Sequence, residues 1–144
     1  MRRPDFPYSE IAASVLPGWE ISLAFVTPKV AKALNKKLRG KNYTPNVLSY
    51  QAGEKSGEVI ICLREAGRQA PEYGMSPRHF VLCLFIHALL HLAGRRHGST
   101  MEKRERTLCK KWSVFPRPYV STHRHRHRYR HLPGQAGGRR GDRR

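Results

Sequence analysis

The sequence has 144 residues, enough for one domain with a hydrophobic core and too few for two of ordinary size. It contains 28 Lys plus Arg against 10 Asp plus Glu, which gives a formal net charge of +18. The segment after residue 120 carries +7 of this charge, so residues 1–120 still carry +11. A chain this basic attracts polyanions, although a soluble basic surface without a partner has the same composition.

Cysteine usage and hydropathy indicate a cytoplasmic protein without a membrane segment. Cys62, Cys83 and Cys109 are widely spaced among apolar residues and odd in number, which argues against a disulfide framework and favours a reducing compartment. The first ten residues, MRRPDFPYSE, lack the apolar segment of a signal peptide. The longest apolar run, residues 80–93, contains two histidines and is shorter than the roughly 20 residues that span a bilayer.

Hydrophobic periodicity predicts both strands and helices along the chain. Apolar runs rich in β-branched residues predict strands, and apolar residues at helical spacing predict helices. The predicted elements, in chain order, are a helix at 9–16, a strand at 19–26, a helix at 28–39, strands at 46–51 and 58–63, and helices at about 65–70, 77–93 and 101–112. This mixture predicts an α+β domain in which a small mixed β-sheet packs with helices.

Local residues mark where the two most informative helices begin and end. Thr27-Pro28 and Ser76-Pro77 have the pattern of an N-cap followed by a proline in the first turn, and Gly40 is typical of a helix end. We expect residues 1–115 to form the domain. Residues 116–144, rich in His, Arg and Gly, cannot bury enough apolar surface to offset their ordering entropy and are expected to be a disordered basic tail.

Three histidines of the apolar helix and the turn after it predict a metal site. His87 and His91 are four residues apart, which places both imidazoles on one helical face. Gly94 permits a sharp reversal that returns His97 to the same point. Three nitrogen ligands and one open position are typical of a catalytic zinc site, in which bound water becomes a nucleophile near neutral pH. Buried histidines that bond to backbone carbonyls are the alternative.

The neighbours of these histidines argue against two other kinds of site. Ala88 follows His87 where a zinc peptidase of the H-E-x-x-H type has its glutamate base. Cys83 precedes His87 by one turn, about 6 Å along the helix axis, so we interpret it as a core residue and not as a fourth ligand. We likewise assign Cys62 and Cys109 to the core.

Several segments resemble the YbeY family of metal-dependent endoribonucleases. The family pattern H-G-x-L-H-L-x-G-Y-D-H matches residues 87–97, with Ala88 in place of Gly and Arg95-Arg96 in place of Tyr-Asp. Upstream, LNKKLRGKNYTPNVLSY (34–50) resembles the family's L-N-x-x-[YF]-R segment with its following K-D-x-P-T-[DN]-V-L-S-F, and GEVIIC (57–62) resembles its G-D-I-V-I strand. Met101 and Glu105 fit the M-x-x-x-E that follows the third histidine.

The resemblance implies a zinc-dependent endoribonuclease that cuts single-stranded RNA, acting in rRNA maturation and ribosome quality control on precursor rRNA or ribosomal particles. It implies one Zn²⁺ per chain on His87, His91 and His97, which with Arg39 would be the catalytic residues. Arg39 stands where the family has its functional arginine, and a guanidinium suits a phosphate. Without the resemblance, Arg39 reads as a solvated residue at a helix end.

Other cations are candidate substrate-binding residues. We place Lys41, Arg95 and Arg96 with Arg39 in this group, although each could equally face water. Two other functions compete with the nuclease. One is a basic RNA- or ribosome-binding module in which the metal is structural, and it requires a fourth protein ligand. The other is a metal-dependent hydrolase of another substrate, such as a peptide. The oligomeric state is not indicated.

Overall fold

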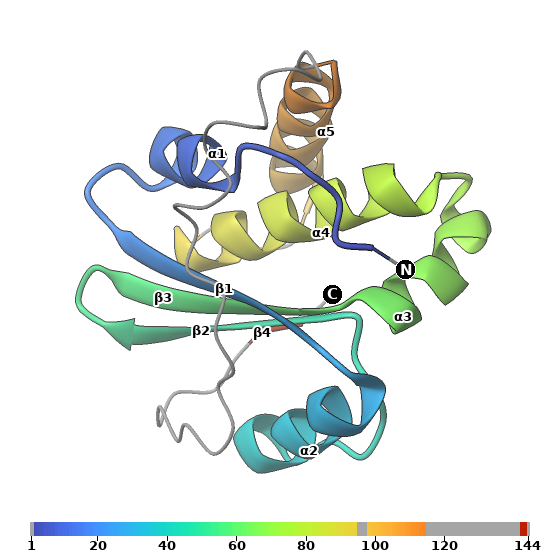
Figure 1. Ribbon diagram of the computed structural model, residues 1–144. Coiled ribbons are helices and arrows are strands. Elements are labelled where there is room, and N and C mark those ends of the chain that lie inside the picture. The colour runs from blue at the N-terminus through green and yellow to red at the C-terminus, as the bar shows by residue number, and fades with distance from the viewer. Residues whose placement is uncertain (1, 95–97, 115–141, 144) are drawn as a thin grey trace.

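A mixed β-sheet lies between helices on both of its faces in the computed structural model, which describes residues 2–94, 98–114 and 142–143 (Figure 1). The elements follow the predicted order closely. They are α1 (Tyr8–Val15), β1 (Glu20–Val26), α2 (Pro28–Arg39), β2 (Val47–Gly53), β3 (Ser56–Cys62), α3 (Leu63–Gln69), the 3-10 helix η1 (Ala70–Tyr73), α4 (Pro77–Leu92), α5 (Ser99–Ser113) and β4 (Asp142–Arg143). The predicted α+β class is confirmed.

The sheet has the strand order β1-β3-β2-β4. β1 runs parallel to β3 over seven residues, from Glu20 opposite Ser56 to Val26 opposite Cys62. β2 and β3 form an antiparallel hairpin in which both strands extend about two residues further toward the turn than predicted, because β2 ends at Gly53 and β3 starts at Ser56. Residues 116–144, predicted to be a tail, lie outside the described residues except for β4, which pairs with β2.

Alternating side chains of the strands build a separate hydrophobic core on each face of the sheet. Val59 and Ile61 of β3 belong to the larger core, which also contains the buried residues of α4. Ile60 of the same strand belongs to the smaller core, together with Ala31 and Leu34 of α2. Successive side chains of a strand point to opposite faces, so α4 and α2 lie on opposite sides of the sheet, as Figure 1 shows.

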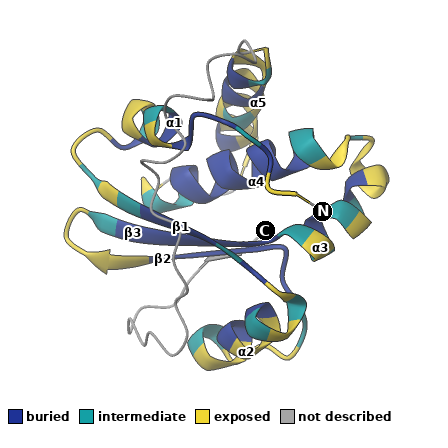
Figure 2. Cartoon of the chain, in the orientation of Figure 1, coloured by how far each residue is buried: buried dark blue, intermediate teal, exposed yellow. Residues whose placement is uncertain are grey.

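Helix α4 is buried from Phe80 through Leu90, a stretch of one helix with no exposed stripe (Figure 2). It packs on β2 and β3 with one side and contacts α1, α3 and α5 with the others. Its start is capped as predicted, because the Ser76 hydroxyl accepts a hydrogen bond from the His79 amide at 3.1 Å. A helix surrounded in this way gives any polar side chain on it a fixed environment.

The last residue of α4 contacts the start of β3. A Cβ on Gly57 would lie 2.8 Å from Cδ1 of Leu92, so the absence of a side chain at position 57 lets the helix end approach the strand closely. Since Leu92 directly follows His91, this contact places the histidine end of α4 beside the beginning of β3. No single described helix is long and apolar enough to cross a membrane, and only the pair 63–73 and 77–92, bent by 103°, passes that test together.

Candidate metal centre

His87 and His91 of α4 point at each other. Their Nε2 atoms are 2.9 Å apart, and their ring centroids are separated by 4.5 Å with an interplanar angle of 71°. His87 is buried and His91 is half-buried. The predicted placement of both imidazoles on one helical face is therefore correct, and the pair opens toward the surface at His91.

Glu105 of α5 contacts the other nitrogen of His87. Its Oε1 lies 2.7 Å from His87 Nδ1, in the range of a short, charge-assisted hydrogen bond. An ionised carboxylate can only accept, so Nδ1 donates and carries a proton. In a neutral imidazole the Nε2 of His87 then has its lone pair free, and His91 Nε2 must be the donor between the two rings.

The donor set of this pair fits a zinc ion. Two nitrogens bound tetrahedrally at about 2.0–2.1 Å lie roughly 3.3 Å apart, a few tenths of an ångström more than the distance between the two Nε2 atoms. A metal-bound histidine ordinarily donates its second ring N–H to a carboxylate or carbonyl, as His87 does to Glu105. The pair thus has the chemistry and nearly the spacing of two ligands.

The third predicted ligand, His97, lies outside the described residues, and so do Arg95 and Arg96. Among the residues that the structure describes, no group of three His, Cys, Asp or Glu side chains could hold a metal ion. The three-histidine site therefore stays a prediction. Two of its three ligands, His87 and His91, are among the described residues.

Arg39 ends α2 on the other face of the sheet. It is half-buried, with a buried Nη1 atom, and Gly40 after it adopts φ 72°, which reverses the chain. Buried Asn35 donates from Nδ2 to the Tyr43 carbonyl at 2.9 Å and so fixes the returning loop. Lys41 in this loop is exposed. The role of Arg39 as a catalytic residue together with the histidines stays a prediction.

The direction of α2 nevertheless brings Arg39 toward the histidine end of the sheet. α2 starts directly after β1 and runs back beneath the sheet (Figure 1). Its 12 residues span about 18 Å, most of the roughly 23 Å length of a seven-residue strand. Its C-terminal end therefore lies toward the start of β3, the end at which Leu92 contacts Gly57.

The three cysteines are buried and unbridged, as predicted for core residues. A side-chain hydrogen bond with Cys83, together with burial, raises the pKa of the Cys109 thiol, and burial raises the pKa of Cys62. Cys83 Sγ also lies 3.6 Å from His79 Nε2. Cys83 is one helical turn before His87 on α4. The raised pKa values make Cys62 and Cys109 poor metal ligands, because a metal binds the thiolate.

A second polar cluster lies at the opposite end of the sheet, where β3 meets α3. It borders a surface groove of about 560 Å³ between the 43–46 loop and α3. Asn46 donates to Gln69 at 2.8 Å, and Gln69 donates to Glu65 at 2.6 Å. Hydrogen bonds from Arg68 first, and then from Gln69, hold the pKa of the Glu65 carboxyl below its usual value. This network supports the loop before β2 and is separate from the histidines.

The comparison with protein families decides the affiliation of the chain. The model described as endoribonuclease YbeY matches residues 7–113. The chain belongs to the YbeY endoribonuclease family. It is therefore a hydrolase that acts on RNA, as the resemblance in the histidine segment implied.

Individual relatives agree with this assignment. The endoribonuclease YbeY of Thiobacillus denitrificans is 35% identical over 121 residues, which cover 77% of this chain and 82% of the relative. That of Neisseria meningitidis serogroup B is 35% identical over 116 residues, covering 69% and 68%. The solution structure of TM1509 from Thermotoga maritima has a TM-score of 0.56 at 22% identity, covering 76% of this chain and 81% of that chain, and it supports the fold.

Within the YbeY-like domain, Glu105 is the site residue to which sequence reasoning gave no role. It appeared only as the last residue of a matched M-x-x-x-E segment. The buried residues of α5 include Met101, Leu108 and Trp112, so position 105 falls on an otherwise apolar stripe at i, i+4, i+7 and i+11. A carboxylate on such a stripe was the signal that could have revealed it.

Proposed function

We propose that this chain is a zinc-dependent endoribonuclease specific for single-stranded RNA, with one ion held by His87, His91 and His97. The observation that carries the proposal is the 2.9 Å approach of the two Nε2 atoms combined with the carboxylate on His87 Nδ1. When bound, zinc would supply a Lewis acid and a water of lowered pKa. The buried face of α4 holds His87 in one orientation and excludes water from its inner side.

Arg39 would stabilise the negative charge that gathers on the phosphate during hydrolysis. A phosphodiester in the transition state needs a cation on its nonbridging oxygens, and the planar guanidinium can bind two of them. Arg39 is half-buried, and Asn35 fixes the loop that follows it, so the end of α2 that carries Arg39 has a defined position at the surface. Lys41, Arg95 and Arg96 would bind backbone phosphates nearby.

The substrate class follows from the family and from the charge. YbeY relatives are endoribonucleases, and this chain carries +18 in total, with +11 on residues 1–120. Such a surface favours association with an extended polyanion at low salt. We infer precursor rRNA or ribosomal particles as the partners, in the cytoplasm, and the basic tail as a further source of RNA affinity.

Metal analysis and RNA cleavage by the wild type and His87→Ala test this proposal. We expect about one zinc per wild-type chain and cleavage of single-stranded RNA, and for His87→Ala a loss of metal with a fall in cleavage of more than about 100-fold. His79→Ala is the matched control, since His79 lies on the same helix two turns away from the pair. Full metal content and activity in His87→Ala would refute the metal assignment.

A further inference from the structure

We propose that Glu105 is a positioning residue that fixes the tautomer of His87, so that Nε2 is the atom offered to the metal. The inference deepens the proposed function and rests on it for the metal. Its structural basis is the 2.7 Å contact between Glu105 Oε1 and His87 Nδ1. By holding the proton on Nδ1, the carboxylate keeps the lone pair on Nε2, which faces His91 at 2.9 Å.

The burial of the two partners makes this bond strong enough to select one tautomer. The side chain of His87 is 6% exposed and that of Glu105 is 21% exposed, so water competes little for either group. A hydrogen bond to a charged acceptor is stronger than one between neutral groups, and more so where water is largely excluded, so it favours the tautomer with the proton on Nδ1. The His87 ring therefore stays in one orientation before any ligand arrives.

The position of Glu105 is set by the packing of a whole helix. Met101, Leu108 and Trp112 of α5 are buried on the same face, and Cys109 on the next turn contacts Cys83 of α4. Cys83 of α4 contacts Cys109 of α5, and His87, further along α4, contacts Glu105, earlier on α5. The two helices therefore run antiparallel. The carboxylate is thus held by the α4–α5 interface, where burying it would be costly without the His87 partner.

The same bond defines what must change at His91. With His87 Nε2 as acceptor, His91 Nε2 is the donor in the hydrogen bond between the two rings. Zinc held by both Nε2 atoms would require the neutral His91 ring to carry its proton on Nδ1 instead, whereas His87 already carries its own proton there. Glu105 therefore sets the metal-binding tautomer of His87 in advance, and the half-buried His91 is the ring whose tautomer would change.

Two measurements on the full-length protein test the proposal, with Glu105→Gln and Glu105→Ala as variants. The first is the nitrogen chemical shifts of His87, measured on protein stripped of metal at about pH 8, above the ordinary pKa of an imidazole. The second is zinc affinity by competition with a chromophoric chelator. The matched control is Glu102→Gln, an exposed carboxylate three residues earlier on α5.

We expect the wild type to show a single Nδ1–H tautomer at His87, and Glu105→Ala to show a mixture. Zinc affinity should fall about 10-fold in Glu105→Gln and up to about 100-fold in Glu105→Ala, with Glu102→Gln unchanged. Glu105→Gln preserves side-chain volume, so it keeps the test valid if the alanine variant fails to fold.

Unchanged zinc affinity together with an unchanged His87 tautomer in folded Glu105 variants would overturn the proposal. A wild type that binds no zinc would instead overturn the proposed function. The two failures are distinguishable, because the tautomer is measured without metal and reports on the Glu105–His87 bond alone.

Discussion

The two faces of the sheet position their functional groups by different physical means. On the α4 face, His87 and Glu105 are held by packed helices and bond to each other within a large core. On the α2 face, the apolar residues of α2 fill a small core and its lysines point into solvent. Buried polar groups must have partners and so acquire fixed geometry, whereas exposed lysines keep their freedom and contribute charge.

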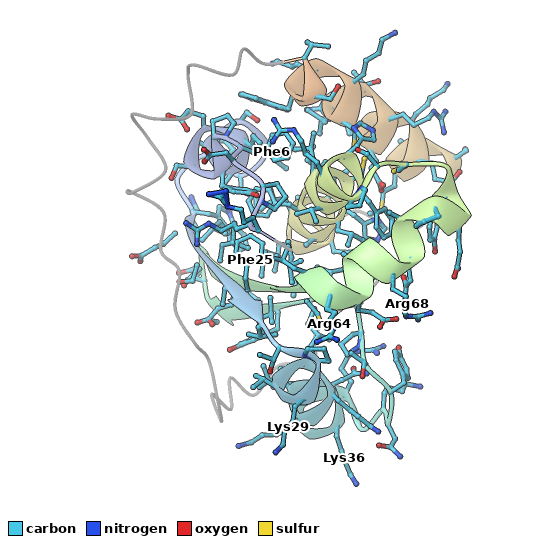
Figure 3. The ribbon with its side chains drawn as sticks, turned by 45° about the vertical axis from the view of Figure 1, so that its right-hand side comes forward. Phe6, Phe25, Lys29, Lys36, Arg64 and Arg68 are labelled. Atoms are coloured by element: carbon cyan, nitrogen blue, oxygen red, sulfur yellow. The ribbon has the colours of Figure 1, made fainter. Side chains whose placement is uncertain are left out.

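The α2 face has an unusually uniform charge. Residues 27–53 contain six Lys and Arg and no Asp or Glu. Lys29 and Lys36 project from α2 away from the sheet in Figure 3, and Lys32 and Lys37 are also exposed. The α4 face thus holds the histidine pair in a fixed geometry, whereas the α2 face contributes a positive electrostatic potential. Variants on each face test whether both contact the same RNA.

The largest effect is expected for Arg39→Lys, which tests whether the two faces share one active site. A lysine keeps the charge but not the planar fork, so cleavage at saturating RNA should fall about 100-fold while RNA affinity changes little. Single-turnover cleavage and equilibrium binding measure the two quantities separately. Arg64→Lys, the same change at an exposed arginine of α3, is the control. Equal losses of rate in both variants would place Arg39 outside the active site.

Neutralising the lysines of α2 and of α5 separately compares how much each helix contributes to the electrostatic attraction of RNA. We expect the change of Lys32, Lys36 and Lys37 to Gln to reduce the slope of log affinity against log salt by roughly 2, at about 0.7 per phosphate contact. The same change at Lys103, Lys110 and Lys111 should reduce it by less than about 1, because Glu102 and Glu105 lie on that helix. A larger reduction from the α5 set would reverse the assignment of the main RNA-binding face.

The smallest effect is expected for Gly57→Ala, which perturbs the contact between the histidine end of α4 and the sheet. The added Cβ would lie 2.8 Å from Leu92 Cδ1, but a leucine end can move, so the loss of stability should be about 1 kcal/mol. Urea denaturation measures it, and zinc affinity should fall slightly, since Leu92 follows His91. Gly53→Ala is the control, with its nearest contact at 3.4 Å. Equal free energies of unfolding for Gly57→Ala and Gly53→Ala would show that the close contact between position 57 and Leu92 does not affect stability.

The sequence by itself determined the elements and the local part of the site. Strands and helices were predicted to within about two residues at most ends, because alternation, helical spacing and capping residues such as Thr27 act over a few positions. The convergence of His87 and His91 was also local, since a spacing of four residues is fixed by the helix itself.

Only the tertiary structure decided the relations between distant segments. The contact of Glu105 with His87 joins residues 18 apart on two helices, and the placement of α2 and α4 on opposite faces depends on the strand order and on which side of the sheet each helix packs. Periodicity says which side of a helix is apolar but not which surface covers it. The polar partner of His87 and the face that carries Arg39 were therefore set by packing, which acts between segments that the local pattern cannot relate.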